Sequence, residues 1–196
     1  MFCRVYHRLT VLSPPRLPRT GAAIVVCNHV SSLDPLLIQS ACPRMIHWMM
    51  AEEYYDIRGM HWVFKTMDTI PVDRGGRDMA ATRVALRTLE AGQVLGIFPE
   101  GRIESSRQLL PFQTGVAMMA AKTGVAIHPA YLDGTQRGRE MLPAFCTPCR
   151  ATLRFGEPLT LPRSAGAKGA LDDATAQIVA AVERLGAVDS WAQNLR

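Results

Sequence analysis

The chain has 196 residues, of which 48% are hydrophobic and 20% are charged. These proportions exclude a disordered chain, and the length is enough for one domain with a substantial core. A formal net charge of +5 favours an anionic partner, namely a phosphorylated substrate, an acidic membrane surface or nucleic acid. No nucleic-acid-binding module is recognisable, so nucleic acid is not an expected partner.

The cysteines and the hydropathy indicate a reducing compartment and no membrane span. Five cysteines, an odd number, are scattered along the chain, which does not resemble a disulfide framework. Cys146 and Cys149 form a CxxC pair, which leaves half a zinc site or a redox pair open. A lone pair cannot close a tetrahedral site, so no metal is expected. Because no apolar run reaches the roughly 18 to 20 residues that cross a bilayer, we expect a cytoplasmic protein that is at most peripheral on a membrane.

Residues 1–20 are predicted to be a lead-in to the domain. Apolar side chains fall at helical spacing near its start: Phe2, Val5, Tyr6 and Leu9. With arginines between them, they form either a short interfacial anchor or a segment that packs on the domain. The proline-rich residues 13–21 are not expected to be helical. The domain is predicted to span residues 21–186, followed by a C-terminal tail over residues 187–196.

A strand predicted over residues 22–26 leads directly into a histidine and a carboxylate. His29 and Asp34 are five positions apart in one short loop, so the carboxylate can reach the imidazole. An imidazole held by a carboxylate is the usual general-base arrangement, because the acid fixes the tautomer and stabilises the imidazolium. The alternative is structural. Asp34 followed by Pro35 is also a good N-cap with proline at N1, at the start of a helix predicted over residues 35–41.

Large adaptable side chains gather after a second strand, which is predicted over residues 45–50. They are Tyr54, Tyr55, Met60, Trp62, Val63, Phe64 and Met67. Such a cluster is either core or a lipid-facing groove, since methionine and aromatic side chains suit variable acyl chains. A short apolar piece then ends at Arg74 and Arg77, on either side of a glycine pair. This loop either binds a phosphate through guanidinium and backbone N–H groups or is a solvated turn.

Strands and helices alternate along the rest of the chain. Apolar spacing predicts helices over residues 81–89, 115–122 and 172–185, and strands over residues 93–98, 125–132 and 151–156. Residues 133–149 are predicted to be a loop. His128 lies in a buried strand without a carboxylate at local spacing, and we interpret it as structural. The alternation predicts a single α/β domain with a mostly parallel central sheet and helices on both faces.

The strand over residues 93–98 leads into Glu100, Gly101 and Arg102. Open α/β sheets bind ligands at the carboxyl ends of their strands. We therefore expect this turn and the loop that holds His29 to share one cleft.

Four blocks of the sequence resemble the lysophosphatidate acyltransferase family of glycerolipid acyltransferases. The first, Asn28-His29 with Asp34, matches the family's NHxxxxD block. The other three, in family order, are residues 70–74, 98–101 and 127–134. The third block departs from the usual Glu-Gly-Thr-Arg-Ser, because Arg102 directly follows Gly101. This variant resembles enzymes that reacylate lysophosphatidylethanolamine.

The resemblance implies an O-acyltransferase that moves a fatty acyl group from acyl-CoA or acyl-carrier protein to the hydroxyl of a lysophospholipid such as 1-acylglycerol-3-phosphate. His29 would be the general base, and Asp34 would orient it. The acceptor's phosphate and glycerol hydroxyls would be bound by Arg74, Glu100, Gly101 and Arg102. An acyl thioester is already activated, so neither a protein nucleophile nor a cofactor is implied.

Two other functions remain open from the sequence. A thioester or ester hydrolase would use the same residues with water in place of the acceptor. A non-enzymatic lipid-binding module would keep the fold without needing His29. Ser32 lies near the base, but the chain has no Gly-x-Ser-x-Gly elbow, so an acyl-enzyme intermediate is not expected.

Overall fold

The structure is a computed structural model that describes residues 1–55, 65–76, 78–104, 109–139, 141–166 and 169–193. These residues form a seven-stranded sheet in the order β1-β7-β6-β2-β5-β3-β4. β6 and β7 are antiparallel, whereas the other neighbouring strands pair in parallel. The predicted mostly parallel α/β sheet is therefore confirmed.

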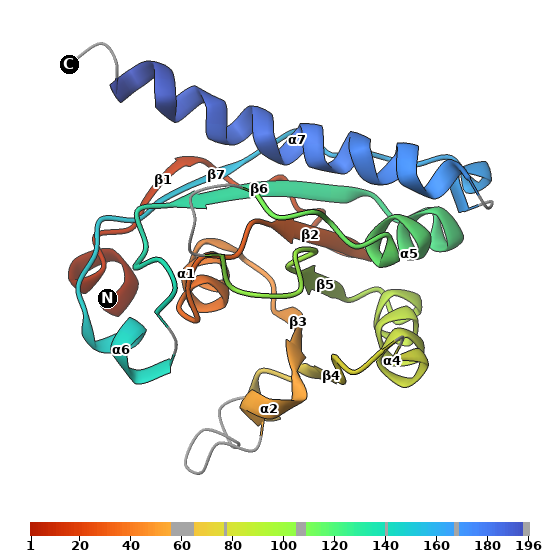
Figure 1. The fold of residues 1–196 in the computed structure, drawn as a ribbon, viewed down its shortest axis with the longest axis horizontal. Helices are drawn as coiled ribbons and strands as arrows, with labels where there is room; N and C mark the ends of the chain where they lie inside the picture. Colours follow the sequence, from red (N-terminus) through yellow and green to blue (C-terminus); the bar gives the residue numbers. More distant parts are fainter. Residues whose placement is uncertain (56–64, 77, 105–108, 140, 167–168, 194–196) are drawn as a thin grey trace.

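The elements alternate along the chain as the apolar spacing predicts (Figure 1). The strands are β1 (Thr10–Ser13), β2 (Ala23–Cys27), β3 (Ile46–Ala51), β4 (Ile70–Val72), β5 (Val94–Ile97), β6 (Ile127–Asp133) and β7 (Thr152–Phe155). The α-helices are α1 (Asp34–Ala41), α2 (Glu52–Tyr55), α4 (Met79–Glu90), α5 (Gly115–Thr123), α6 (Met141–Cys146) and α7 (Ala170–Gln193). A π-helical turn, η1 (Phe2–Tyr6), and a 3₁₀ turn, η2 (Arg163–Gly166), complete the set.

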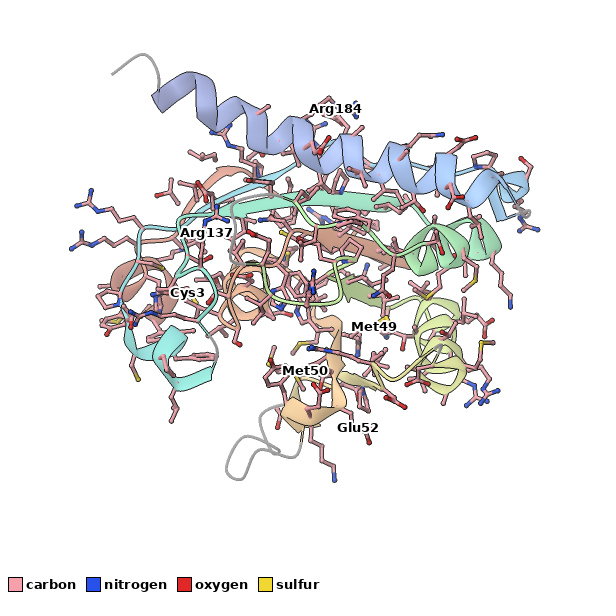
Figure 2. All side chains as sticks on the ribbon, viewed as in Figure 1. Cys3, Met49, Met50, Glu52, Arg137 and Arg184 are labelled. Carbon is pink, nitrogen blue, oxygen red and sulfur yellow. The ribbon has the colours of Figure 1, made fainter. Side chains whose placement is uncertain are left out.

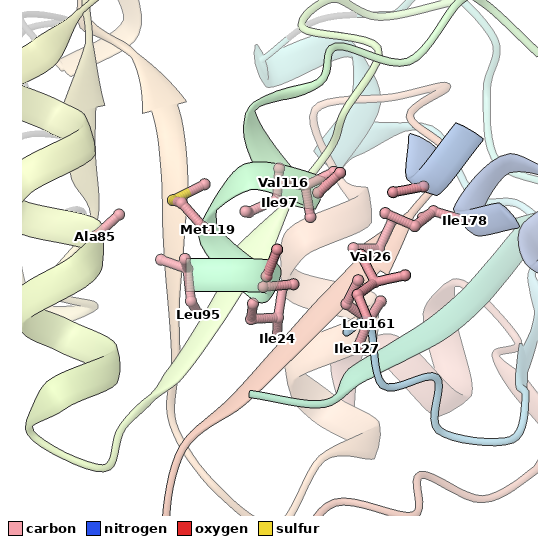
Figure 3. Close-up of a cluster of buried hydrophobic side chains, with 14 of the residues drawn as sticks. Ile24, Val26, Ala85, Leu95, Ile97, Val116, Met119, Ile127, Leu161 and Ile178 are labelled. Carbon is pink, nitrogen blue, oxygen red and sulfur yellow. The ribbon is translucent and has the colours of Figure 1, made fainter. Parts of the chain in front are cut away.

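Helices cover both faces of the sheet, as predicted. Successive side chains of a strand point to opposite faces, and β2 is buried along its whole length. Ile24 and Val26 belong to the core cluster that includes residues of α4, α5 and α7, and Figure 3 shows Val26 beside Ile178 of α7. The alternate residues Val25 and Cys27 belong to the second cluster, with residues of α1, α6 and η1. A strand buried on both faces is the usual centre of a parallel sheet.

The N-terminal lead-in is part of the fold, which corrects the predicted domain start at residue 21. β1 lies within residues 1–20 and pairs in parallel with β7, with Thr10 opposite Thr152. Before it, Cys3 and Leu9 are buried in the second core cluster. A four-residue edge strand followed by prolines carries too short a pattern to be recognised in isolation, and pairing with β7 stabilises it.

The C-terminal helix is longer than predicted. α7 runs from Ala170 to Gln193 and so includes most of the segment that was predicted to be a tail over residues 187–196. Gly186, which directly follows the helix predicted over residues 172–185, lies inside α7. A Cβ at Gly186 would come within 2.6 Å of the Tyr131 ring, so glycine allows α7 to pack closely on β6. The predicted loop over residues 133–149 likewise contains the short helix α6.

Among the helices in the described ranges, none combines the length and the apolar character needed to cross a bilayer.

Candidate active site

His29 and Asp34 meet in the loop that follows β2. His29 Nδ1 lies 3.0 Å from Asp34 Oδ2, and the same oxygen accepts hydrogen bonds from the backbone N–H groups of Val30 (2.7 Å) and Ser31 (2.9 Å). Asp34 is fully buried. A carboxylate only accepts, so Nδ1 carries the proton in this contact, and Nε2 of the neutral ring is left as an acceptor.

The carboxylate of Asp34 does not cap its helix, which corrects the helix-cap interpretation. The N-cap position of α1 is Leu33, and no side-chain hydrogen bond caps this end. Asp34 is the first helical residue, and its side chain turns back toward the loop instead. The start of α1, with Pro35 in its first turn, is thus a rigid base from which the carboxylate holds the imidazole.

Two aromatic side chains support the imidazole ring. The His29 ring stacks on Phe98, with ring centres 4.0 Å apart and planes 16° apart, and Phe98 stacks on buried Trp48 at 4.7 Å and 10°. Gly96 makes room for this stack, because a Cβ there would lie 2.5 Å from Trp48 Cε3. The stack joins β3, β5 and the loop after β2. It was not predicted, since no local pattern in the sequence links these residues.

The turn after β5 holds the main chain of His29 on both sides. Glu100 Oε1 accepts the N–H of His29 at 2.9 Å, and Oε2 accepts the N–H of Leu110 at 3.0 Å. The N–H of Glu104 donates to the carbonyl of His29 at 2.8 Å. Burial raises the pKa of Glu100, and the N–H donors of His29 and Leu110 partly offset this rise. Glu100 therefore positions His29, while its predicted contact with the acceptor stays a prediction.

The loop after β6 holds the other side of the loop that carries His29. The N–H of Gly138 donates to the carbonyl of Val30 at 3.0 Å, and the N–H of Ser32 donates to the carbonyl of Arg139 at 3.3 Å. The guanidinium of Arg137 joins the loops after β5 and β6, because it lies 3.0 Å from Glu104 and 3.0 Å from Asp133.

Asn28 fixes the end of β2 on β6. Its side-chain amide donates to the carbonyl of Leu132 at 2.9 Å, and its side-chain oxygen accepts the N–H of Leu132 at 2.8 Å. The backbone pairing of β2 with β6 ends at Cys27, and these two side-chain hydrogen bonds continue the contact between the two strands by one residue. The asparagine beside His29 thus has a structural role that its spacing in the sequence did not reveal.

His29 lines a cavity of about 1070 Å³ that is rich in methionine. Six methionines contribute to its wall: Met49, Met50, Met67, Met79, Met118 and Met119. Figure 2 shows two of them, Met49 and Met50, on β3. Tyr54 and Met67, two members of the predicted aromatic and methionine cluster, line this cavity. Met60, Trp62, Val63 and Phe64 lie outside the described residues.

The structure places all the predicted binding residues around this cavity as well, namely Arg74, Glu100, Gly101 and Arg102. Arg74 follows β4, and its guanidinium lies 3.9 Å from Glu53 and 5.6 Å from the centre of the Tyr54 ring. Arg102 is exposed. Gly101 has φ of +69°, and a Cβ there would lie 2.5 Å from Gln113 Nε2, so the turn requires glycine.

The remaining titratable candidates, His128 and Cys149, do not line the cavity. His128 is buried, and loss of solvation lowers its pKa, as suits a structural histidine. The Cys149 thiol lies 3.4 Å from His7 Nδ1, and burial raises its pKa to about 11. A thiol of this kind is a poor nucleophile at neutral pH. Within the part of the chain that the structure describes, no three histidine, cysteine or acidic side chains gather as metal ligands.

Comparison with known proteins assigns this site to a family. The model of the Acyltransferase family matches residues 8–133, which include β1 to β6 and every site residue predicted from the sequence. The chain belongs to this acyltransferase family.

Several curated acyltransferases are similar in sequence. Over 150 residues the chain is 25% identical to the 1-acyl-sn-glycerol-3-phosphate acyltransferase of Bacillus subtilis, covering 76% of this chain and 72% of that protein. It is 31% identical over 135 residues to the enzyme of the same name from Borreliella burgdorferi, covering 65% of this chain and 52% of that one. The chain thus spans about half the length of the second relative.

A solved structure has the same fold. The 1-acyl-sn-glycerophosphate acyltransferase of Thermotoga maritima superposes with a TM-score of 0.72 at 22% identity, covering 96% of this chain and 75% of that one. At this identity the likeness shows the fold.

In this acyltransferase, the first three sequence blocks bring their site residues to the carboxyl ends of parallel strands. His29 follows β2, Arg74 follows β4, and Glu100 follows β5, while the fourth block includes β6 itself. Because these strands are parallel, their carboxyl ends meet at one edge of the sheet. Residues far apart in sequence therefore share one cavity, as the strand pattern predicts.

Proposed function

We propose that the chain transfers a fatty acyl group from acyl-CoA or acyl-carrier protein to the hydroxyl of a lysophospholipid such as 1-acylglycerol-3-phosphate. The observation that carries this proposal is the His29–Asp34 pair, 3.0 Å apart, on the wall of a methionine-rich cavity. Methionine side chains are flexible and polarisable, so such a wall adapts to acyl chains of different shape.

His29 acts as the general base. Nε2 accepts the proton of the acceptor hydroxyl while the hydroxyl oxygen attacks the thioester carbonyl, and the thiolate of the donor then leaves and takes up a proton. Asp34 keeps the proton of Nδ1 in place and stabilises the imidazolium as it forms. The stack on Phe98 and the bonds from Glu100 and Glu104 keep the ring oriented.

Arg74 and Arg102 bind the anionic head of the acceptor. Both line the cavity that His29 lines, and they come from two different loops, after β4 and after β5. Guanidinium groups bind phosphate oxygens through paired hydrogen bonds. The relatives' names support lysophosphatidate as the acceptor. The altered third block, with Arg102 directly after Gly101, makes lysophosphatidylethanolamine the alternative acceptor.

An acyl-transfer assay with a panel of lysophospholipids tests this function, using both acyl-CoA and acyl-carrier-protein donors. We expect acylated phospholipid from the native chain and a decrease in kcat of about 100-fold or more for His29→Ala, because general-base catalysis contributes about that much. The rate should also fall in acidic buffer, because an imidazolium cannot accept the hydroxyl proton.

The chain contains a matched control for this variant. His47 lies 3.2 Å from Asp68 but does not line the cavity, so His47→Ala removes a similar histidine–carboxylate pair and should leave kcat unchanged. Release of free fatty acid at the same rate with and without the acceptor would instead identify a hydrolase. A native rate in His29→Ala would refute the assignment of the base.

A further inference from the structure

The outward side of α4 combines arginines with exposed apolar side chains. Five exposed residues at helical spacing form this side, and we call them the α4 surface: Met79, Ala80, Arg83, Val84 and Arg87. Met79 is 59% exposed and Val84 is 44% exposed, although both side chains are large and hydrophobic. The other side of the helix is buried in the core. Figure 1 shows α4 at the edge of the molecule, beside β4, so the α4 surface faces solvent.

The two arginines of the α4 surface are available to a partner. Arg83 and Arg87 are one helical turn apart, so they lie on the same side of α4. Neither forms an ion pair with a carboxylate among the described residues. Asp78 lies near Arg83, but its carboxylate accepts two backbone N–H groups at the start of α4. Two guanidinium groups at this spacing match two carboxylates one turn apart on a helix of an acidic partner.

The α4 surface adjoins the cavity that His29 lines. Met79 belongs to both, because its side chain lines the cavity and is also largely exposed. It therefore lies at an opening of the cavity. Thr82, on the neighbouring side of the helix, lines the cavity as well. Because Arg83 is one turn after Met79, a partner bound to the arginines lies next to this opening.

The shape of the α4 surface favours a protein over a nucleotide. Acyl-CoA and acyl-carrier protein, the two donors considered above, both hold the acyl thioester on a long flexible arm. They differ at the other end of the arm, which is a nucleotide in CoA and a small acidic protein in the carrier. Sites for small molecules are concave, whereas the exposed side of a helix is convex. A second protein can pack against such a side, and complementary charges then guide its association.

We propose that the α4 surface docks an acidic acyl-carrier protein, whose arm delivers the acyl thioester past Met79 into the cavity. The inference rests on the proposed function, because it identifies the donor of that reaction. A second copy of the chain is a poorer partner for this surface, since it would bring the arginines of two α4 helices together.

Transfer kinetics with two donors test the proposal in the full chain. Palmitoyl-acyl-carrier protein and palmitoyl-CoA are compared at one concentration of 1-acylglycerol-3-phosphate. We expect Arg83→Glu and Arg87→Glu each to lower kcat/KM for the carrier-protein donor about tenfold, mainly through KM, because like charges oppose association. Arg87→Gln, which only removes the charge, should lower it about threefold. With palmitoyl-CoA, kcat/KM should stay within about twofold of the native value, since the remaining effect of an exposed charge is screened by salt.

Arg163→Glu is the matched control. Arg163 is an exposed arginine of η2 that does not line the cavity, so the same reversal of charge should leave kcat/KM unchanged with both donors. An equal loss of kcat/KM with both donors in Arg83→Glu, Arg87→Glu and Arg87→Gln would overturn the proposal, because the α4 surface would then not distinguish a carrier protein from CoA.

Direct binding separates docking from catalysis. Calorimetric titration of His29→Ala with palmitoyl-acyl-carrier protein measures docking without turnover, and we expect the Kd to rise about tenfold when Arg87→Glu is added. Binding that depends on Arg87, with no transfer by the native chain, would refute the proposed transferase and support the docking surface. Transfer from palmitoyl-CoA by the native chain, with no binding of the carrier protein, would overturn the docking surface and leave the proposed function intact.

Discussion

Asp34 Oδ2 accepts three contacts, from the imidazole of His29 and from two backbone N–H groups. The N–H groups lie in the loop between His29 and Asp34, so the carboxylate shapes the same loop that carries its partner. A hydrogen-bonded carboxylate that is buried next to an imidazole both orients the ring and supplies negative charge. These two roles can be separated by substitution.

Asp34→Asn separates them. The asparagine oxygen can occupy the position of Oδ2 and keep the hydrogen bonds, but the negative charge that stabilises the imidazolium is lost. We expect kcat to fall by at least about 100-fold while the protein stays folded. Steady-state kinetics and a thermal melt measure the two effects. Asp68→Asn, at the partner of His47, is the control and should leave kcat unchanged.

At Glu100, burial and hydrogen bonding have opposite effects on the pKa of the carboxyl. Burial is the largest influence and raises the pKa of its carboxyl, although backbone N–H donors lower it. The folded protein therefore holds this proton more tightly than the unfolded chain does. The stabilisation is fully present below the unfolded-state pKa and is lost as pH rises through the folded-state pKa.

Glu100→Gln removes this titration. The free energy of unfolding of the native protein, minus that of the variant, should decrease as pH rises from about 4 to about 7. Denaturant unfolding at several pH values measures this difference, and an increase with pH would contradict it. Kinetics of the same variant distinguish its two roles: we expect mainly kcat to fall, because the bond to the N–H of His29 positions the base. A change confined to KM would favour the acceptor contact instead.

At the scale of the elements, the loop that carries His29 lies between two other loops and is hydrogen-bonded to both. The sheet order places β2 between β5 and β6, so the loops after these strands flank the loop after β2. The loop after β5 holds both main-chain groups of His29, and the loop after β6 holds Val30 and Ser32. Arg137, labelled in Figure 2, connects the two flanking loops through Glu104 and Asp133.

Arg137→Met tests this connection. The methionine keeps the length of the side chain but removes the cation from Glu104, whose side chain is 3% exposed. We expect the free energy of unfolding to fall by about 1–3 kcal/mol, because a carboxylate in such a place depends on its charged partner. We also expect a lower kcat with little change in KM, since the base would be less well held.

Arg163→Met is the control for this experiment. Arg163 is an exposed arginine of η2, and its replacement should alter neither stability nor kcat. An unchanged kcat in Arg137→Met, together with a loss of stability, would show that Arg137 supports the fold without positioning His29.

At the scale of the whole molecule, a central parallel sheet is the feature that creates the site. Strands of one direction end at one edge, so the four blocks converge although the first and last are about a hundred residues apart. The helices on both faces bury β2 completely and make that edge rigid. The N-terminal turn η1 packs on α1, which begins at Asp34.

Local patterns were enough to predict much of this arrangement. Runs of apolar residues predicted β2, β5 and β6, and helical spacing predicted α4 and α5, because these patterns depend on near neighbours in the chain. The spacing of His29 and Asp34 was enough to predict their contact. The predictions were wrong at the two ends of the domain, where the local patterns are weak. β1 forms because it pairs with β7, and α7 continues through Gly186 because a glycine there fits against the Tyr131 ring.

The sequence by itself determined the fold class, the family and the His29–Asp34 pair. Only the tertiary structure decided what holds His29 in place. The partner of the His29 N–H, Glu100, is 71 positions away, and the partner of Asn28, Leu132, is 104 positions away. Such partners depend on which strands become neighbours in the sheet, and no local spacing encodes that. The aromatic stack beneath His29 depends in the same way on β3 and β5 lying side by side.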